Sequence, residues 1–140
     1  TIMNNIINNT KEINELKSGL DIVRDGKVYK NSTLTKDPLS IRKYAFVTDT
    51  LKCSNIIEII KDVDILYHEA TYLHKDLNLA RLTCHSTAIQ AAQIAHDSGA
   101  KKLLLGHYSS RYTDSKVIEE EAQTVFENSV ATADRDVFVL

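Results

Sequence analysis

Short apolar runs, each followed by polar residues, recur along the second half of the chain. Runs of this kind occur at residues 44–47, 63–67 and 101–105, and another closes the chain at 137–140. An apolar run of roughly four to eight residues bounded by turn-forming residues is typical of a buried strand. We therefore predict three internal strands and one closing strand.

Three segments have the spacing of amphipathic helices. Residues 54–61 begin with a capping residue type and carry four isoleucines, and residues 86–99 repeat alanine and isoleucine and end at Gly99. Residues 114–126 begin with acidic side chains, which suit a helix N-terminus. The alternation of strands and helices predicts an α/β fold with a largely parallel sheet.

The first forty residues have a different pattern. Residues 1–10 are rich in asparagine without a hydrophobic period, so we expect the frayed end of a loop or extension there. Asp25-Gly26 lies between two short runs and is a strong signal for a β-hairpin. Residues 31–40 contain the only proline and are expected to form a polar connection.

Polar side chains follow three successive predicted strands. Asp49 comes after the first, His68-Glu69 after the second and His107 after the third. Ligand-binding groups of such sheets gather outside the carboxyl ends of the strands. An aspartate at this point also commonly starts a turn. Asp49 and His107 together are nevertheless suitable ligands for Zn²⁺, and a carboxylate has two oxygens with which to bridge two ions.

His85 precedes the long predicted helix. It is either an ordinary histidine at a helix start or an imidazole near a scissile phosphate, oriented and made more basic by Glu69. A carboxylate–imidazole pair of this kind donates a proton to a leaving oxygen. The spacing alone favours neither reading.

A dense polar turn follows the third strand, with the sequence Gly106-His107-Tyr108-Ser109-Ser110-Arg111-Tyr112. Glycine permits close backbone approach, hydroxyls donate to phosphate oxygens, and Arg111 is suited to bidentate phosphate binding. In an ordinary strand–helix loop the same side chains would satisfy backbone groups. The three strand-end groups nearby favour a phosphate site.

Composition sets limits on these readings. The chain has 140 residues, enough for one ordinary domain, with 17 basic and 19 acidic side chains and a net charge of −2. A nucleic-acid module is usually basic, so composition leaves RNA binding open. Cys53 and Cys84 are isolated and are expected to be reduced. No segment has the pattern of a membrane span or a signal peptide, and a cytoplasmic fragment of a longer chain is expected.

Four motifs resemble those of the ribonuclease Z family of the metallo-β-lactamase superfamily. The matches are the strand and Asp-Thr motif at residues 46–50, His68-Glu69-Ala70-Thr71, His85-Ser86-Thr87, and the polar turn at residues 106–112. The order and the separations also fit, and the resemblance covers roughly residues 16–140.

The resemblance implies the C-terminal half of a metallo-β-lactamase αββα sandwich, with a mixed sheet and helices packed on it. It implies that residues 1–15 are the end of a flexible arm or linker and residues 16–140 the half-domain. The implied activity is cleavage of precursor tRNA at its 3′ end by a homodimeric enzyme with two Zn²⁺ ions. The implied roles are metal binding for Asp49 and His107, catalysis for His85 and Glu69, and substrate binding for Ser109 and Arg111.

Two departures from the family pattern matter. The family's HxHxDH motif, which carries most of the metal ligands, is absent, as is the histidine before the arm. With only Asp49 and His107 remaining, we predict that this chain alone is inactive and holds zinc weakly or not at all. Asp134 follows Thr132-Ala133 in place of the usual Ala-x-Asp, so its role stays open. The alternatives are another phosphodiesterase or arylsulfatase-like hydrolase of the same fold, or a non-catalytic half-domain.

Overall fold

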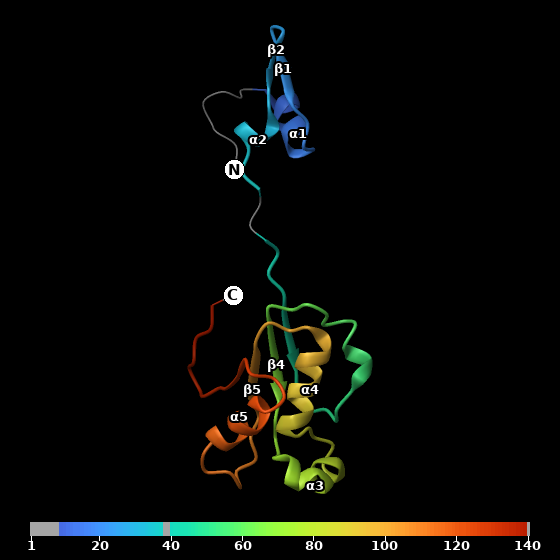
Figure 1. The fold of residues 1–140 in the computed structure, drawn as a ribbon, viewed down its shortest axis with the longest axis vertical. Coiled ribbons are helices and arrows are strands. Elements are labelled where there is room, and N and C mark those ends of the chain that lie inside the picture. Colours follow the sequence, from blue (N-terminus) through green and yellow to red (C-terminus); the bar gives the residue numbers. More distant parts are fainter. Residues whose placement is uncertain (1–8, 38–39, 140) are drawn as a thin grey trace. The chain divides into compact units, whose positions relative to one another are not determined.

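The chain divides into two compact units, Thr1–Ile41 and Arg42–Leu140. The structure is a computed structural model, and it describes residues 9–37 and 40–139. Figure 1 shows the helices and strands of each unit. In the described part of the chain, no helix is both long and apolar enough to cross a membrane.

The first unit consists of a helix, a hairpin and a helical turn. Helix α1 (Thr10–Lys17) is capped by the Asn9 side chain, and α2 (Asn31–Leu34) is one short turn. Strands β1 (Ile22–Arg24) and β2 (Lys27–Tyr29) pair antiparallel, so the predicted hairpin is confirmed. The backbone φ angles of Asp25 and Gly26 are 52° and 72°, as a tight hairpin turn requires. Its small core comprises Leu16, Ile22 and Leu34.

The domain division expected at residues 15 and 16 does not coincide with this unit. Residues 10–15 lie within α1, and the connection expected at 31–40 begins with α2. Residues 1–8, most of the expected extension, lie outside the described residues. The described unit holds together because α1 covers the hairpin and Glu12 accepts a hydrogen bond from Arg24 at 2.5 Å. Whether residues 1–15 form the base of an arm stays a prediction.

The second unit is built on a four-stranded parallel sheet in the order β3-β4-β5-β6. Its strands are β3 (Tyr44–Val47), β4 (Ile65–Glu69), β5 (Leu103–Gly106) and β6 (Ser129–Ala131). The predicted α/β fold and the three predicted internal strands are therefore confirmed. A mixed sheet was expected. Among the described residues, the four-stranded sheet is parallel throughout, and the antiparallel pairing is confined to the separate β1–β2 hairpin.

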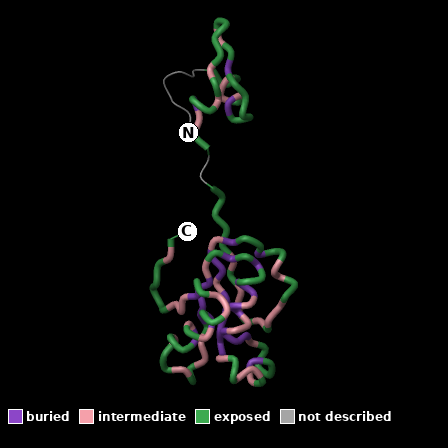
Figure 2. Tube along the Cα trace, in the orientation of Figure 1, coloured by how far each residue is buried: buried purple, intermediate pink, exposed green. Residues whose placement is uncertain are grey.

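Two helices pack against one face of this sheet (Figure 1). Helix α4 (Ala88–Ser98) begins with a capping box between Thr87 and Gln90 and ends at Gly99 with φ 68°. Helix α5 (Lys116–Gln123) is shorter than the predicted 114–126. The core lies between helices and sheet, and Figure 2 shows burial concentrated there. Its fully buried members include Leu66, Leu103 and Leu105 from the strands and Ala91, Ala95, Ile94 and Ile118 from the helices.

The helix predicted at residues 54–61 is wrong. Only Ser54–Ile56 forms a 3₁₀ turn (η1), followed by further turns. Cys53 supplies no side-chain cap, and β-branched isoleucines favour helix weakly. Ile60 is buried while Ile59 is 83% exposed, so one isoleucine anchors the segment without a helical face.

The closing strand predicted at residues 137–140 is also wrong for its described residues. Val137 and Val139 are 86% and 87% exposed, and residues 137–139 pair with no strand. The place beside β5 is taken by β6, whose sequence Ser-Val-Ala is too short to be recognised from its pattern. Two further elements were not predicted, the 3₁₀ turn η2 (His74–Asp76) and helix α3 (Leu77–Leu82).

Candidate active site

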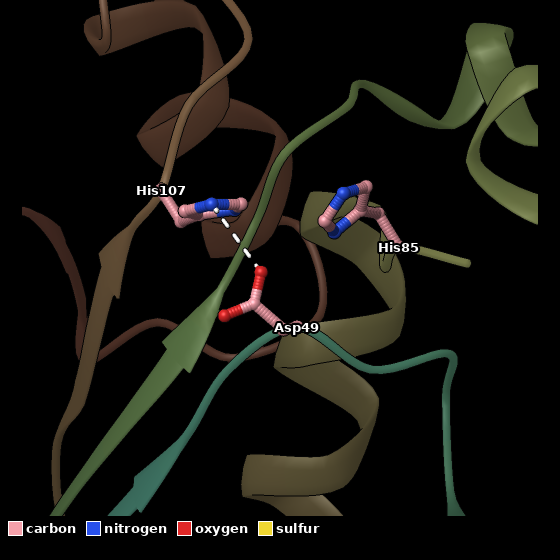
Figure 3. Close-up of side chains that lie close together, drawn as sticks. All are labelled: Asp49, His85 and His107. Atoms are coloured by element: carbon pink, nitrogen blue, oxygen red, sulfur yellow. Dashed lines mark ion pairs between the residues drawn. The ribbon is translucent and has the colours of Figure 1, made fainter. Parts of the chain in front are cut away.

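The strand register places the candidate residues at one edge of the sheet. Val47 of β3 pairs with His68 of β4, and Glu69 pairs with Gly106 of β5. Because the strands are parallel, the residues that follow them emerge together at the carboxyl edge. Asp49 and His107 therefore come from different strands to the same place (Figure 3).

Asp49, His85 and His107 form a cluster that could hold a metal ion. Their ligand atoms all lie within 4.8 Å of one another, and Nε2 of His107 is 3.5 Å from Oδ1 of Asp49 (Figure 3). One carboxylate oxygen and two imidazole nitrogens are a donor set that fits Zn²⁺. All three side chains retain solvent exposure, with His85 the most covered at 21%. The cluster is therefore open to an ion and to a substrate.

Asp49 and His107 both have left-handed backbone conformations. Their φ angles are 50° and 59°, and Cys84, immediately before His85, has φ 61°. Aspartate and histidine tolerate this region better than most residues, but it still costs free energy. The surrounding structure must hold these turns, and each of them directs a member of the cluster.

Glu69 forms the floor of the site and is completely buried. Its carboxylate accepts hydrogen bonds from the Thr50 amide at 2.5 Å, the Thr71 hydroxyl at 2.6 Å and the Ser86 amide at 3.2 Å. Nδ1 of His85 lies 3.0 Å from the same carboxylate. Since an ionised carboxylate only accepts, Nδ1 of His85 carries the proton and its Nε2 is left as the acceptor.

Backbone pairing brings His85 to this floor. The amide of Tyr72, just beyond β4, donates to the carbonyl of Ser86, and the amide of Ala88 donates to the carbonyl of Tyr72. The Ser86 hydroxyl donates to the Thr50 carbonyl at 2.7 Å. This ties the loop after β3 to the segment before α4. The sequence did not point to a role in the site for Thr50, Thr71 or Ser86, although each of them belongs to one of the motifs described above.

Ser109 and Arg111 lie in the loop that carries His107, but no described side-chain contact joins either of them to the three residues of the cluster. The Arg111 guanidinium is 3.7 Å from the Asp76 carboxylate and lies over the Tyr72 ring at 5.2 Å. Its Nε donates to the Ser109 hydroxyl at 3.3 Å. The assignment of both residues to substrate binding stays a prediction. Asp134 is exposed in the segment after β6.

His68 is a buried histidine for which the sequence predicts no specific role. Its Nδ1 donates to the Glu69 carbonyl at 2.7 Å, while Nε2 has no hydrogen-bond partner. Burial lowers the pKa of this imidazole from its ordinary value of 6.5. The lowered pKa favours the neutral ring. His68 points into the helix side of the sheet, beside Val47 and Leu105.

The fold of this chain is similar to that of a known class of protein. The chain superposes on the metallo-β-lactamase fold protein YhfI from Bacillus subtilis with a TM-score of 0.57 and 25% identity, over 63% of this chain and 35% of that one. No protein-family model matches the chain. The fold is that of part of a metallo-β-lactamase domain.

Comparison of sequences indicates a particular family within this fold. The chain is 48% identical to ribonuclease Z of Porphyromonas gingivalis over 111 residues, which is 79% of this chain and 36% of the relative. It is 42% identical to ribonuclease Z of Bacteroides fragilis over 120 residues, which is 85% of this chain and 40% of the relative. The chain is thus homologous to ribonuclease Z over most of its length, and it spans two fifths or less of these two relatives.

Proposed function

We propose that this chain is the C-terminal part of a ribonuclease Z, a cytoplasmic, homodimeric endonuclease that matures the 3′ end of precursor tRNA. One observation carries the proposal. Asp49, His85 and His107 converge over the buried carboxylate of Glu69, in a chain 48% identical to a ribonuclease Z. A site with two imidazoles, an exposed carboxylate and a buried one suits hydrolysis of a phosphodiester.

Asp49 and His107 would hold zinc. Bound zinc lowers the pKa of a coordinated water toward neutrality and so supplies hydroxide at ordinary pH. A catalytic zinc usually has three protein ligands, so two ions need more ligands than this chain offers in the cluster. The remaining ligands would come from other segments of a longer protein.

His85 would donate a proton from Nε2 to the leaving 3′ oxygen, and it would first take up that proton from solvent, since Nε2 of the neutral ring carries none. Glu69 accepts a hydrogen bond from Nδ1 of His85, which orients the ring and leaves Nε2 available to the substrate. Arg111 and Ser109, on the same loop as His107, would turn from their present partners to the phosphate backbone. The Arg111 contact with Asp76 is long and exposed enough to release at low cost.

His85 lies within ligand distance of Asp49 and His107, so it also qualifies as a metal ligand. A ligating histidine commonly gives its second N–H to a carboxylate, as His85 does. The two roles predict different amounts of bound metal in a variant that lacks the His85 imidazole. Loss of a ligand empties the site, whereas loss of a proton donor leaves the ions bound.

The test uses full-length protein with the substitutions Asp49→Asn, His107→Asn and His85→Asn. We expect the first two to lose bound metal and cleavage of precursor tRNA. His85→Asn should keep its metal and lose about 10²–10⁴-fold in kcat. The control is His96→Asn, because His96 is exposed in the last turn of α4, where the only described partner of its side chain is the neighbouring Asp97.

Two outcomes would contradict this assignment. Loss of metal from His85→Asn would make His85 a ligand. Turnover of a small phosphodiester with no cleavage of precursor tRNA by the wild-type protein would favour another phosphodiesterase of the same fold.

A further inference from the structure

Thr71 connects Glu69 to His107 through a single hydroxyl group. Its Oγ1 lies 2.6 Å from Oε2 of Glu69 and 2.9 Å from Nδ1 of His107. The side chain is buried, with the residue only 5% exposed. The Thr71 carbonyl also accepts a 3.0 Å hydrogen bond from the Ser109 amide, in the loop that carries His107. Thr71 therefore contacts both the ring of this histidine and the loop that carries it.

The direction of these hydrogen bonds follows from the donors available. A hydroxyl has one proton, and an ionised carboxylate only accepts, so the Thr71 proton lies toward Glu69. The 2.6 Å distance is in the range of a charge-assisted O–H···O⁻ bond. A lone pair of the hydroxyl then faces Nδ1 of His107, which must carry a proton. Nε2 of His107 is left unprotonated, on the side of Asp49.

Both cluster imidazoles are thus brought to the same tautomer by one carboxylate. Glu69 contacts His85 directly at 3.0 Å but is 4.0 Å from Nδ1 of His107, with Thr71 between them. The Thr71 hydroxyl fixes the orientation of the His107 ring and leaves its Nε2 lone pair free, as a metal ligand requires.

We propose that Thr71 is a positioning residue for His107: it relays the Glu69 carboxylate to Nδ1, so that Nε2 is presented for metal binding. The consequence for metal binding rests on the proposed function. The tautomer itself depends only on the hydrogen bonds of this chain.

The first measurement is the histidine tautomer in metal-free full-length protein labelled with ¹⁵N-histidine, observed by NMR at a pH where His107 is neutral. We expect the Nδ1–H form for His107 in the wild type and in Thr71→Ser, which keeps the hydroxyl. Thr71→Val, which has nearly the same shape but no hydroxyl, should lose this preference. Thr124→Val is the control, because among the described residues the Thr124 hydroxyl bonds only to the Glu121 carbonyl of α5.

The second measurement is zinc affinity by competition with a chelator. Loss of an outer-shell partner typically costs about 10–100-fold in affinity, and we expect that loss in Thr71→Val. Thr71→Ser should restore affinity close to that of the wild type, which a merely space-filling role of the methyl group would not predict.

A wild-type His107 that carries its proton on Nε2 would overturn the proposal, even if Thr71→Val fails to fold. So would a Thr71→Val protein that folds with unchanged tautomer and zinc affinity. If the wild type shows the expected tautomer but does not cleave precursor tRNA, the relay stands and the proposed function fails.

Discussion

Nδ1 of His85 lies 3.0 Å from Oε2 of Glu69, and the two side chains differ sharply in exposure, 21% against 0%. The pair therefore joins the open surface of the site to its floor. A buried ionised carboxylate is tolerated only when its oxygens are well satisfied, and Glu69 has four donors around it. Fold and site depend on the same hydrogen bonds.

Replacement of Glu69 by glutamine should destabilise the chain as well as disable the site. The amide NH₂ must face N–H or O–H donors on one side, which leaves buried donors unpaired at a cost of about 1–3 kcal/mol for each. We expect a lower free energy of unfolding in urea. The control Glu120→Gln removes an exposed contact at 3.9 Å and should change stability by less than about 0.5 kcal/mol. Equal stability of the two variants would contradict the role of Glu69 as a structural acceptor.

Gly106 allows β5 to approach the Tyr67 side chain. A Cβ at this position would overlap the ring and hydroxyl of Tyr67. Gly106→Ala should therefore cost about 1–3 kcal/mol of stability by overpacking. In a Tyr67→Ala background the same change should cost much less, since the overlapping atoms are gone. A double-mutant cycle of urea unfolding measures this coupling, and simple additivity would rule out the steric explanation.

The sequence predicted the parts of the structure whose signals are local. Helix α4 has its cap at Thr87 and its stop at Gly99, and the three internal strands are compact apolar runs. Because parallel strands end at one edge, the convergence of Asp49 and His107 followed from the order of elements alone.

The predictions that were wrong concern which strands pair with each other and how a segment is held by its surroundings. Nothing in Val137 or Val139 indicates that the place beside β5 is taken by β6. The isoleucines after Ser54 have a helical spacing, but without a cap they fold as turns. The relay through Thr71 depends on a hydroxyl lying between two side chains from different strands, which spacing along one chain does not encode.

His68 should make stability depend on pH. Burial lowers its pKa below the 6.5 of the unfolded chain, so between the two values the unfolded state binds more protons than the folded state. Its contribution is complete above 6.5 and is lost as pH falls through the folded pKa. His68→Asn, which keeps a donor for the Glu69 carbonyl, should reduce the loss of unfolding free energy between about pH 7.5 and about pH 5.5. His96→Asn should leave that loss unchanged, and an equal effect of both substitutions would show that burial of His68 is not the cause.

The sheet face opposite α4 should drive self-association of this chain. Tyr44 and Phe46 are 52% and 61% exposed on β3, which is an edge strand, and Phe46 stacks on Tyr67 with ring centroids 4.5 Å apart. An aromatic patch beside an unpaired strand edge is an association site for another chain. We expect sedimentation velocity to show larger species as concentration rises, and Phe46→Lys to suppress them. Val139→Lys is the matched control, because Val139 is equally apolar and 87% exposed but belongs to no strand of the sheet. If Phe46→Lys associates as strongly as the control, contact through this face is excluded, whereas a chain that stays monomeric at every concentration would mean that the exposed aromatics do not attract a second copy.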